Sequence, residues 1–100
     1  MRKGNKEMNV SSKAVITVIG TDSVGIIAKV SGKCSELNVN ILDITQKVYD
    51  STFAMIMLVE TNTLKISFAD FADAMKQLGK ELGVVIRATH EELFRTMHRV

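Results

Sequence analysis

The sequence has little of several features that would point to a function, and each shortage excludes a class of protein. A single cysteine, Cys34, cannot build the disulfide framework of a small secreted fold. The longest purely apolar run, residues 53–59, is far too short to span a bilayer, and no charged-then-apolar leader is recognisable. We therefore expect a cytoplasmic protein with no membrane association. The 100 residues suffice for one domain.

Charge and aromatic residues are also scarce where a nucleic acid would need them. The formal charge is +2, and residues 1–12 supply all of it, since the rest of the chain has ten basic and ten acidic residues. Nucleic-acid binding requires a basic surface that displaces counterions. A sheet that stacks RNA bases also requires aromatic residues on its central strands. The segments 13–20 and 51–60, predicted below to be central, offer only Phe53. We expect no nucleic-acid partner.

Hydrophobic periodicity divides the chain into an arm and one domain. Residues 1–12 have no period and little to bury, which predicts a disordered N-terminal arm, and the domain is expected over 13–100. Two segments that are apolar on both faces predict buried strands, an alternating segment predicts an edge strand, and a fourth strand follows later. The buried strands are expected at 13–20 and 51–60, the edge strand at 38–50 and the fourth strand at 84–89. Helices are expected after Gly25, between Ser67 and a C-cap at Gly83, and from Thr89 to the end.

The order of these elements predicts an α+β fold. Two interlocked right-handed β-α-β units give a ferredoxin-like βαββαβ sandwich, a four-stranded antiparallel sheet with two helices on one face, here followed by a C-terminal helix. The first and third strands are central and the second is an edge. The helices cover one side of strands that are apolar on both, so we expect a homodimer, formed across the open sheet or by pairing of second-strand edges. The terminal helix, through Leu93, Phe94 and Met97, is the alternative cover.

The turn after the first strand concentrates glycine and a carboxylate. Gly20 ends the strand, Asp22 stands where an N-cap is expected, and Gly25 leaves the backbone open to a second chain or a small ligand. Plain helix capping and ligand binding both remain open for Asp22. A stripe of small residues follows on the helix, and either the neighbouring helix or a second subunit could contact it. Its members are Ala28, Ser31, Gly32 and Ser35.

These residues carry a family resemblance. The segment 18–44, VIGTDSVGIIAKVSGKCSELNVNILDI, resembles the core of an ACT domain: a strand, a turn containing Asp or Asn, a glycine, an amphipathic helix, and a Gly-x-Asn-Ile start to the second strand. The resemblance continues more weakly to about residue 90. It is closest to small stand-alone ACT proteins of uncharacterised function and is similar to the ACT modules of the glycine-cleavage repressor. Two positions depart from the pattern: Val24 replaces a frequent proline, and Asn38 replaces the usual glycine.

The resemblance implies a function and a site. In ACT domains that bind amino acids, the ligand lies between the turn and the start of the second strand, usually at a subunit interface. Matching positions nominate Gly20, Asp22, Gly25, Asn40 and Ile41 as ligand-binding residues. We therefore expect a non-catalytic regulatory protein that senses an amino acid or similar metabolite. The alternative is a ligand-free interaction module that regulates an enzyme or transcription through a protein partner.

No catalytic or metal constellation is apparent in the sequence. An acylphosphatase on this fold would need an arginine in the turn 20–25, and a carrier of soft metals would need paired cysteines there. His90 and His98 have no spacing typical of zinc ligands, and Ser23 has no evident base. We expect neither an enzyme nor a cofactor nor a metal site.

Overall fold

A computed structural model of the chain describes residues 12–21 and 25–97. The elements in these residues occur in the order β2 (Lys13–Thr21), α2 (Ile26–Glu36), β3 (Asn40–Tyr49), β4 (Thr52–Glu60), α3 (Phe68–Leu82), β5 (Val85–His90) and α4 (Glu91–Met97). Apart from Ser12, the predicted N-terminal arm lies outside the described residues. Ser12 itself is tied to the domain, because its carbonyl accepts hydrogen bonds from the Thr61 amide and hydroxyl.

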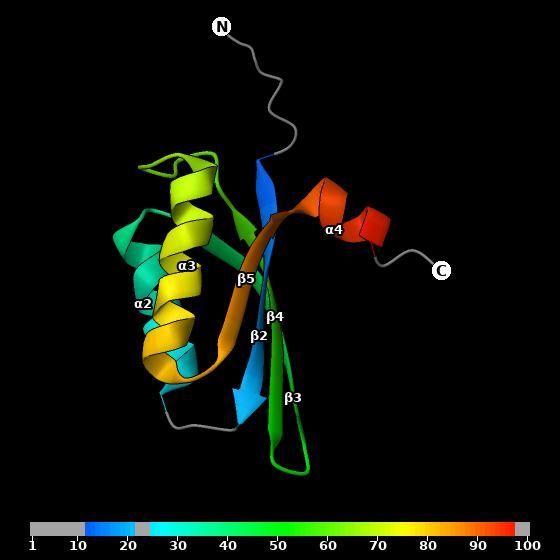
Figure 1. Cartoon of the computed structure of the whole chain (residues 1–100). Coiled ribbons are helices and arrows are strands. Elements are labelled where there is room, and N and C mark those ends of the chain that lie inside the picture. Colours follow the sequence, from blue (N-terminus) through cyan, green and yellow to red (C-terminus); the bar gives the residue numbers. More distant parts are fainter. Residues whose placement is uncertain (1–11, 22–24, 98–100) are drawn as a thin grey trace, which may run out of the picture.

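The strands form one antiparallel sheet in the order β3-β4-β2-β5, with α2 and α3 on one face (Figure 1). This confirms the predicted ferredoxin-like sandwich, with the first and third predicted strands at its centre and the second at an edge. The central strands are rich in β-branched and apolar residues, which suit a pleated surface with neighbours on both sides. The core lies between the sheet and the two helices.

Alternation along the central strands decides which side chains enter that core. On β2 and β4, every second residue is buried against the helices. These residues are Ala14, Ile16, Val18, Phe53, Met55, Met57 and Val59. From the helices, Phe71 and Met75 of α3 and Val30 of α2 are fully buried against them. The residues between them on each strand therefore lie on the open face of the sheet, which neither α2 nor α3 covers.

Helix α3 begins and ends where the sequence predicts. The Ser67 hydroxyl accepts a hydrogen bond from the Asp70 amide at 3.1 Å, as an N-cap does. Gly83 has a left-handed φ of 76°, and its amide donates to the carbonyls of Gly79 and Lys80. Both local rules agree with the apolar spacing of the helix, so its length is fixed by its own sequence.

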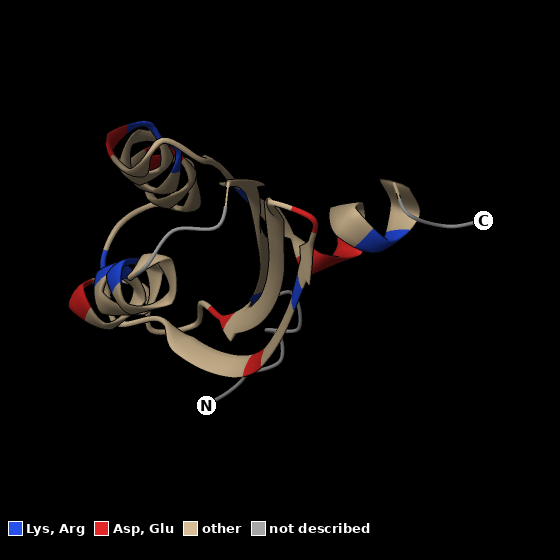
Figure 2. Cartoon of the chain, turned by 90° about the horizontal axis from the view of Figure 1, so that it is seen from below, with Lys and Arg blue, Asp and Glu red and all other residues tan. Residues whose placement is uncertain are grey.

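The other two helices differ from expectation at their starts. Helix α2 begins at Ile26 with Gly25 in the cap position, so the N-cap lies three residues after Asp22, which is itself outside the described residues. Helix α4 begins at Glu91, two residues after the predicted start at Thr89, because Thr89 still belongs to β5. Helix α4 lies on the side of the sheet opposite α2 and α3 and projects away from it (Figures 1 and 2).

Strand β3 is an exposed edge with a bulge near its start. All of its residues except Ile41 are exposed. The register shifts between Ile41, which pairs with Val59, and Asp43, which pairs with Leu58, so that Leu42 is an extra residue on β3. After the bulge, Ile44 and the residues at 46 and 48 face the same side as the helices.

Candidate functional site

The α2–β3 side of the molecule has two pockets, one at each end of α2. The first, the apolar pocket, has a volume of about 760 Å³ and is lined by Gly25, Ile26, Ile27, Ala28, Gln46, Lys47, Val48 and Phe53. The second, the polar pocket, has a volume of about 410 Å³ and is lined by Ser31, Ser35, Asn38, Val39, Asn40, Ile41 and Thr63. Volumes in this range suit small metabolites.

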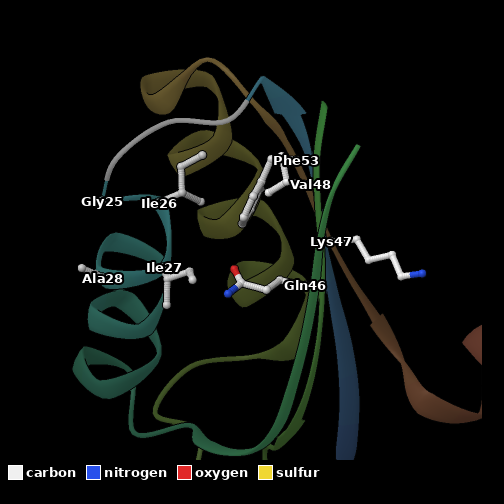
Figure 3. A pocket seen from close by; sticks show the side chains of 8 residues that line it. All are labelled: Gly25, Ile26, Ile27, Ala28, Gln46, Lys47, Val48 and Phe53. Atoms are coloured by element: carbon white, nitrogen blue, oxygen red, sulfur yellow. The ribbon is translucent and has the colours of Figure 1, made fainter. Parts of the chain in front are cut away.

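The apolar pocket contains one amide group among hydrocarbon side chains. Ile27, Val48 and Phe53 point into the space between α2 and the sheet, and the Gln46 amide points into it from β3 (Figure 3). Lys47, although it lies between them in sequence, points to the other side of the sheet (Figure 3). The alternation of β3 thus places a hydrogen-bonding group where it faces an otherwise apolar wall.

The start of α2 adds amide donors beside this pocket that no side chain of the described residues caps. Gly25 has a φ of 90° in the left-handed region, and an added Cβ would meet no atom within 4 Å. No side chain in the described residues caps the helix, and its first turn contains no acidic residue. The first intrahelical bond runs from the Lys29 amide to the Gly25 carbonyl. The preceding amides are therefore without helix acceptors, and with the helix dipole they favour an anionic group.

The polar pocket is organised by asparagine side chains at the start of β3. Asn38 has a φ of 65°, the left-handed conformation that asparagine tolerates in place of the glycine of the ACT pattern that the sequence resembles. Its amide donates to the Thr63 carbonyl at 3.1 Å, and the Thr63 hydroxyl donates to the Asn38 carbonyl at 2.9 Å. Asn40 is exposed, and its amide donates to the Glu60 carboxylate at 3.4 Å. The oxygen of the Asn40 side-chain amide thus remains available to a hydrogen-bond donor.

The predicted site residues divide between the two ends of α2. Gly25 lines the apolar pocket, whereas Asn40 and Ile41 line the polar pocket. Helix α2 has eleven residues, which separates its ends by about 16 Å. Asp22 lies outside the described residues. One chain therefore does not bring the two groups of residues together.

Gly20 has a packing reason to be glycine. A Cβ at this position would lie 2.5 Å from Cγ1 and 3.2 Å from Cα of Val84, so a side chain would collide with the start of the last strand. The close approach of two backbones explains this residue without a ligand.

Gln46 is the pocket residue that sequence reasoning missed. In β3 the outward positions carry Asp43, Thr45 and Lys47, and a polar residue at 46 is easily counted with them. The available signal was its spacing, because Gln46 lies midway between Ile44 and Val48 on the apolar side of the alternation. A polar residue at such a position faces the helices, where it can form a hydrogen bond with a ligand or a second chain.

The small-residue stripe faces the same side as the pockets. Gly32 is exposed, and an added Cβ would meet nothing within 4 Å, so the interpretation as a contact with the neighbouring helix is wrong for this residue. Ala28 lines the apolar pocket, and Ser31 and Ser35 line the polar pocket. The stripe thus runs along the open edge of α2 between the two pockets.

Other reactive groups of the described chain have structural surroundings. Burial raises the pKa of the Cys34 thiol from 9.0 to about 11, which keeps it protonated at neutral pH. The His90 ring stacks on Phe68 with centroids 3.8 Å apart. Among the described residues, no three His, Cys, Asp or Glu side chains lie close enough to hold a metal ion. No helix within residues 12–21 and 25–97 is long and apolar enough to cross a membrane.

Comparisons with known proteins agree with this fold. The family model for the ACT domain matches residues 12–89. A UPF0237 protein of Methanocaldococcus jannaschii is 45% identical over 89 residues, which cover 89% of this chain and 99% of that protein. An ACT domain protein from Streptococcus pneumoniae superposes with a TM-score of 0.73 at 40% identity, covering 82% of this chain and 92% of that one.

A more distant structure shares the fold. A protein named as a glycine cleavage system transcriptional repressor has a TM-score of 0.66 at 22% identity, and the match covers 77% of this chain and 44% of that protein. These similarities confirm the resemblance seen in segment 18–44. The chain belongs to the ACT domain family.

Proposed function

We propose that the protein is a regulatory ACT-domain protein that binds a free amino acid, or a metabolite with the same groups, between two copies of the chain. The observation that carries the proposal is the position of the two pockets at opposite ends of one exposed strand edge. Each pocket supplies half of the groups that an amino acid requires. A two-fold axis through the middle of β3 would bring unlike halves together.

The pairing follows from the geometry of β3. Directly opposite residues of an antiparallel pair face the same side of the sheet, so the two-fold axis must pass at a residue. With the axis at Thr45, Asp43 lies opposite the partner's Lys47, and beyond the Leu42 bulge Asn40 lies opposite the partner's Tyr49. Ile41 is then opposite the partner's Val48. The polar pocket of each copy adjoins the apolar pocket of the other, which gives two equivalent sites and one continuous sheet.

The exposed edge supports such pairing. Leu42, Ile44 and Val48 are 41%, 39% and 57% exposed. A ten-residue edge with free backbone groups and apolar side chains readily pairs with another strand, and proteins usually shorten, charge or cover such an edge. Here the bulge affects only the first residues, and the remaining length is free for a second copy.

The groups around the joined pocket match an amino acid. The amides at the start of α2, which no side chain of the described residues caps, suit the α-carboxylate. The amide oxygens of Gln46 and of Asn40 from the partner subunit suit the α-ammonium group, with Asp22 as a further acceptor by family resemblance. The walls formed by Ile27, Val48 and Phe53 suit an apolar side chain. We therefore expect preference for aliphatic amino acids.

Binding is tested by a thermal-shift screen against the common amino acids, followed by calorimetry. Gln46→Ala and Asn40→Ala should each reduce affinity about tenfold or more, since a hydrogen bond to a charged group contributes roughly 1.5–3 kcal/mol. Gln77→Ala and Asn62→Ala remove the same side chains from exposed positions that line neither pocket, and serve as matched controls.

The outcomes separate the two functions considered for the sequence. Ligand binding that both pocket variants weaken and both control variants retain supports the proposal. A folded protein that responds to no amino acid contradicts it and leaves the ligand-free interaction module. Affinity purification from the native cell then identifies the regulated protein.

A further inference from the structure

The open face of the sheet carries an apolar patch that no element of the described chain covers. We define the open-face patch as Ile19, Ile56 and Val85, which are 54%, 46% and 59% exposed. Ile19 and Val85 are directly paired across β2 and β5, and Ile56 pairs with Thr17, two residues along the same face. These residues lie on three adjacent strands and form one surface.

Helix α4 projects from the same side of the sheet but covers little of it. None of its residues is buried, and Leu93 and Met97 are 54% and 57% exposed. The helix contacts β2 and β5, where it follows directly on His90, the partner of Ala14. Val15, which pairs with Thr89 at this end, is only 5% exposed. The helix then leaves the sheet (Figure 2).

The residues beside the open-face patch and those at the start of α4 carry charges of opposite sign. In the register, Lys47 belongs to the same row of residues as Ile19, and Arg87 to the same row as Ile56, so two cations flank the patch. Neither has an ion-pair partner among the described residues. The first turn of α4 is acidic, with Glu91 bound to Arg95 at 2.8 Å and Glu92 in no ion pair within the described chain.

We propose that the open face is an interface with a second copy of this chain, in which α4 of each copy packs on the open-face patch of the other. Leu93 and Met97 would contact the patch, and Glu92 would lie near Arg87 or Lys47 of the partner subunit. The patch lies two to four residues along the strands from Val15, a distance of about 7 to 13 Å, and a seven-residue helix is about 10 Å long. Two copies facing each other can therefore exchange helices reciprocally.

A second copy of the chain is the partner that we infer, because each copy has both complementary features. A projecting apolar helix with an acidic start and a bare apolar patch with basic flanks occur on the same face, displaced from each other along the strands. A two-fold axis between two copies therefore places α4 of each copy against the open-face patch of the other. The interface lies on the face opposite the α2–β3 pockets, so it is separate from the proposed ligand site. Both interfaces can form in one assembly of four chains.

Light scattering after size-exclusion chromatography tests the inference. We expect about 44 kDa for the wild type, four times the 11.0 kDa chain. Ile56→Glu, and separately Leu93→Glu with Met97→Glu, should halve the mass, whereas Gln77→Glu on exposed α3 should leave it unchanged. Circular dichroism confirms that each variant is folded. Unchanged mass in both face variants overturns the inference.

The β3 edge has its own variant, which keeps the two proposals distinguishable. Ile44→Glu changes the edge and not the open face. A dimer that only Ile44→Glu dissociates overturns the open-face interface and retains the geometry of the ligand site. A dimer that only the face variants dissociate supports the open-face interface and overturns the edge pairing. A wild-type monomer of 11.0 kDa overturns both.

Disulfide trapping provides a second measurement that does not depend on weakening the interface. In a chain carrying Val85→Cys and Leu93→Cys, mild oxidation should give a covalent dimer on a non-reducing gel, because each new thiol meets its complement in the other copy. Val85→Cys with Gln77→Cys is the control, since Gln77 lies on the other side of the sheet. Native Cys34 is buried. Failure of the first pair to cross-link more than the control contradicts the proposal.

Discussion

Replacing Gly79 with alanine should destabilise the protein, although alanine is the better helix former. Gly79 is buried in α3, where the helix contacts β5. A Cβ at this position would lie 2.7 Å from the Val84 carbonyl oxygen, 3.0 Å from the Ile86 amide nitrogen and 3.1 Å from Cγ1 of Ile86. Two of these atoms belong to the backbone, so a change of rotamer cannot remove the collision. Helix and strand would have to separate.

The magnitude follows from two opposing effects. Ordinary contacts of a Cβ begin near 3.4 Å, so the 2.7 Å approach requires α3 or β5 to move by several tenths of an ångström. Overpacking of a close-packed core costs about 1–3 kcal/mol. The higher helix propensity of alanine offsets about 1 kcal/mol of this cost. Because the two shortest contacts are with backbone atoms, the cost lies in the upper part of that range, about 2–3 kcal/mol, and we expect the free energy of unfolding to fall by about 1–2 kcal/mol.

Gly32→Ala is the matched control, because it makes the same change in a helix without the collision. Gly32 is exposed in α2, and its added Cβ would meet nothing within 4 Å. This variant should gain about 1 kcal/mol. Urea denaturation monitored by circular dichroism, at one fixed protein concentration because association adds stability, measures both. If Gly79→Ala is as stable as the wild type while Gly32→Ala shows its gain, the packing argument is refuted.

Two further changes test local features of the helices. Ser67→Ala removes the N-cap bond to the Asp70 amide and should lower the free energy of unfolding by about 1 kcal/mol, measured by urea denaturation against Ser35→Ala on exposed α2. For Cys34, the folded pKa of about 11 lies above the ordinary 9.0, so the unfolded chain loses the proton first. Stability should therefore fall as pH rises from 9 to 11, by up to about 2 kcal/mol relative to Cys34→Ala. Parallel pH profiles of wild type and variant would contradict this.

The fold was predictable because local and global patterns agree in most of the chain. Residues 13–20 and 51–60 are apolar on both faces, which central strands require, and 38–50 alternates as an edge does. Ser67 and Gly83 bound α3 by rules that act within one turn. The start of α2 was not predictable in the same way. Asp22 is a good N-cap residue, but the left-handed conformation of Gly25 sets the last turn before the helix.

The site was less predictable, since sequence spacing does not give distance across a fold. The family pattern names residues on both sides of α2, and only the structure shows that this helix sets them at opposite ends. Gln46 was missed because a polar residue in an edge strand normally faces water. Its direction depends on the register after the bulge, and the register is a property of the pairing with β4.

The bulge in β3 has a consequence for how this strand tolerates changes in length. Leu42 is the residue that lets Ile41 and Ile44, three positions apart, both face the helices. Upstream and downstream halves of the strand are thus out of phase by one residue, and the bulge joins them. Deleting Leu42 would remove the bulge and leave a strict alternation, in which Ile41 and Ile44 still face the helices and Asp43 still faces outward, because their partners on β4 are consecutive residues. A one-residue deletion elsewhere in the strand would instead turn side chains on one side of it to the other face, so length changes in this strand are constrained by phase rather than by space.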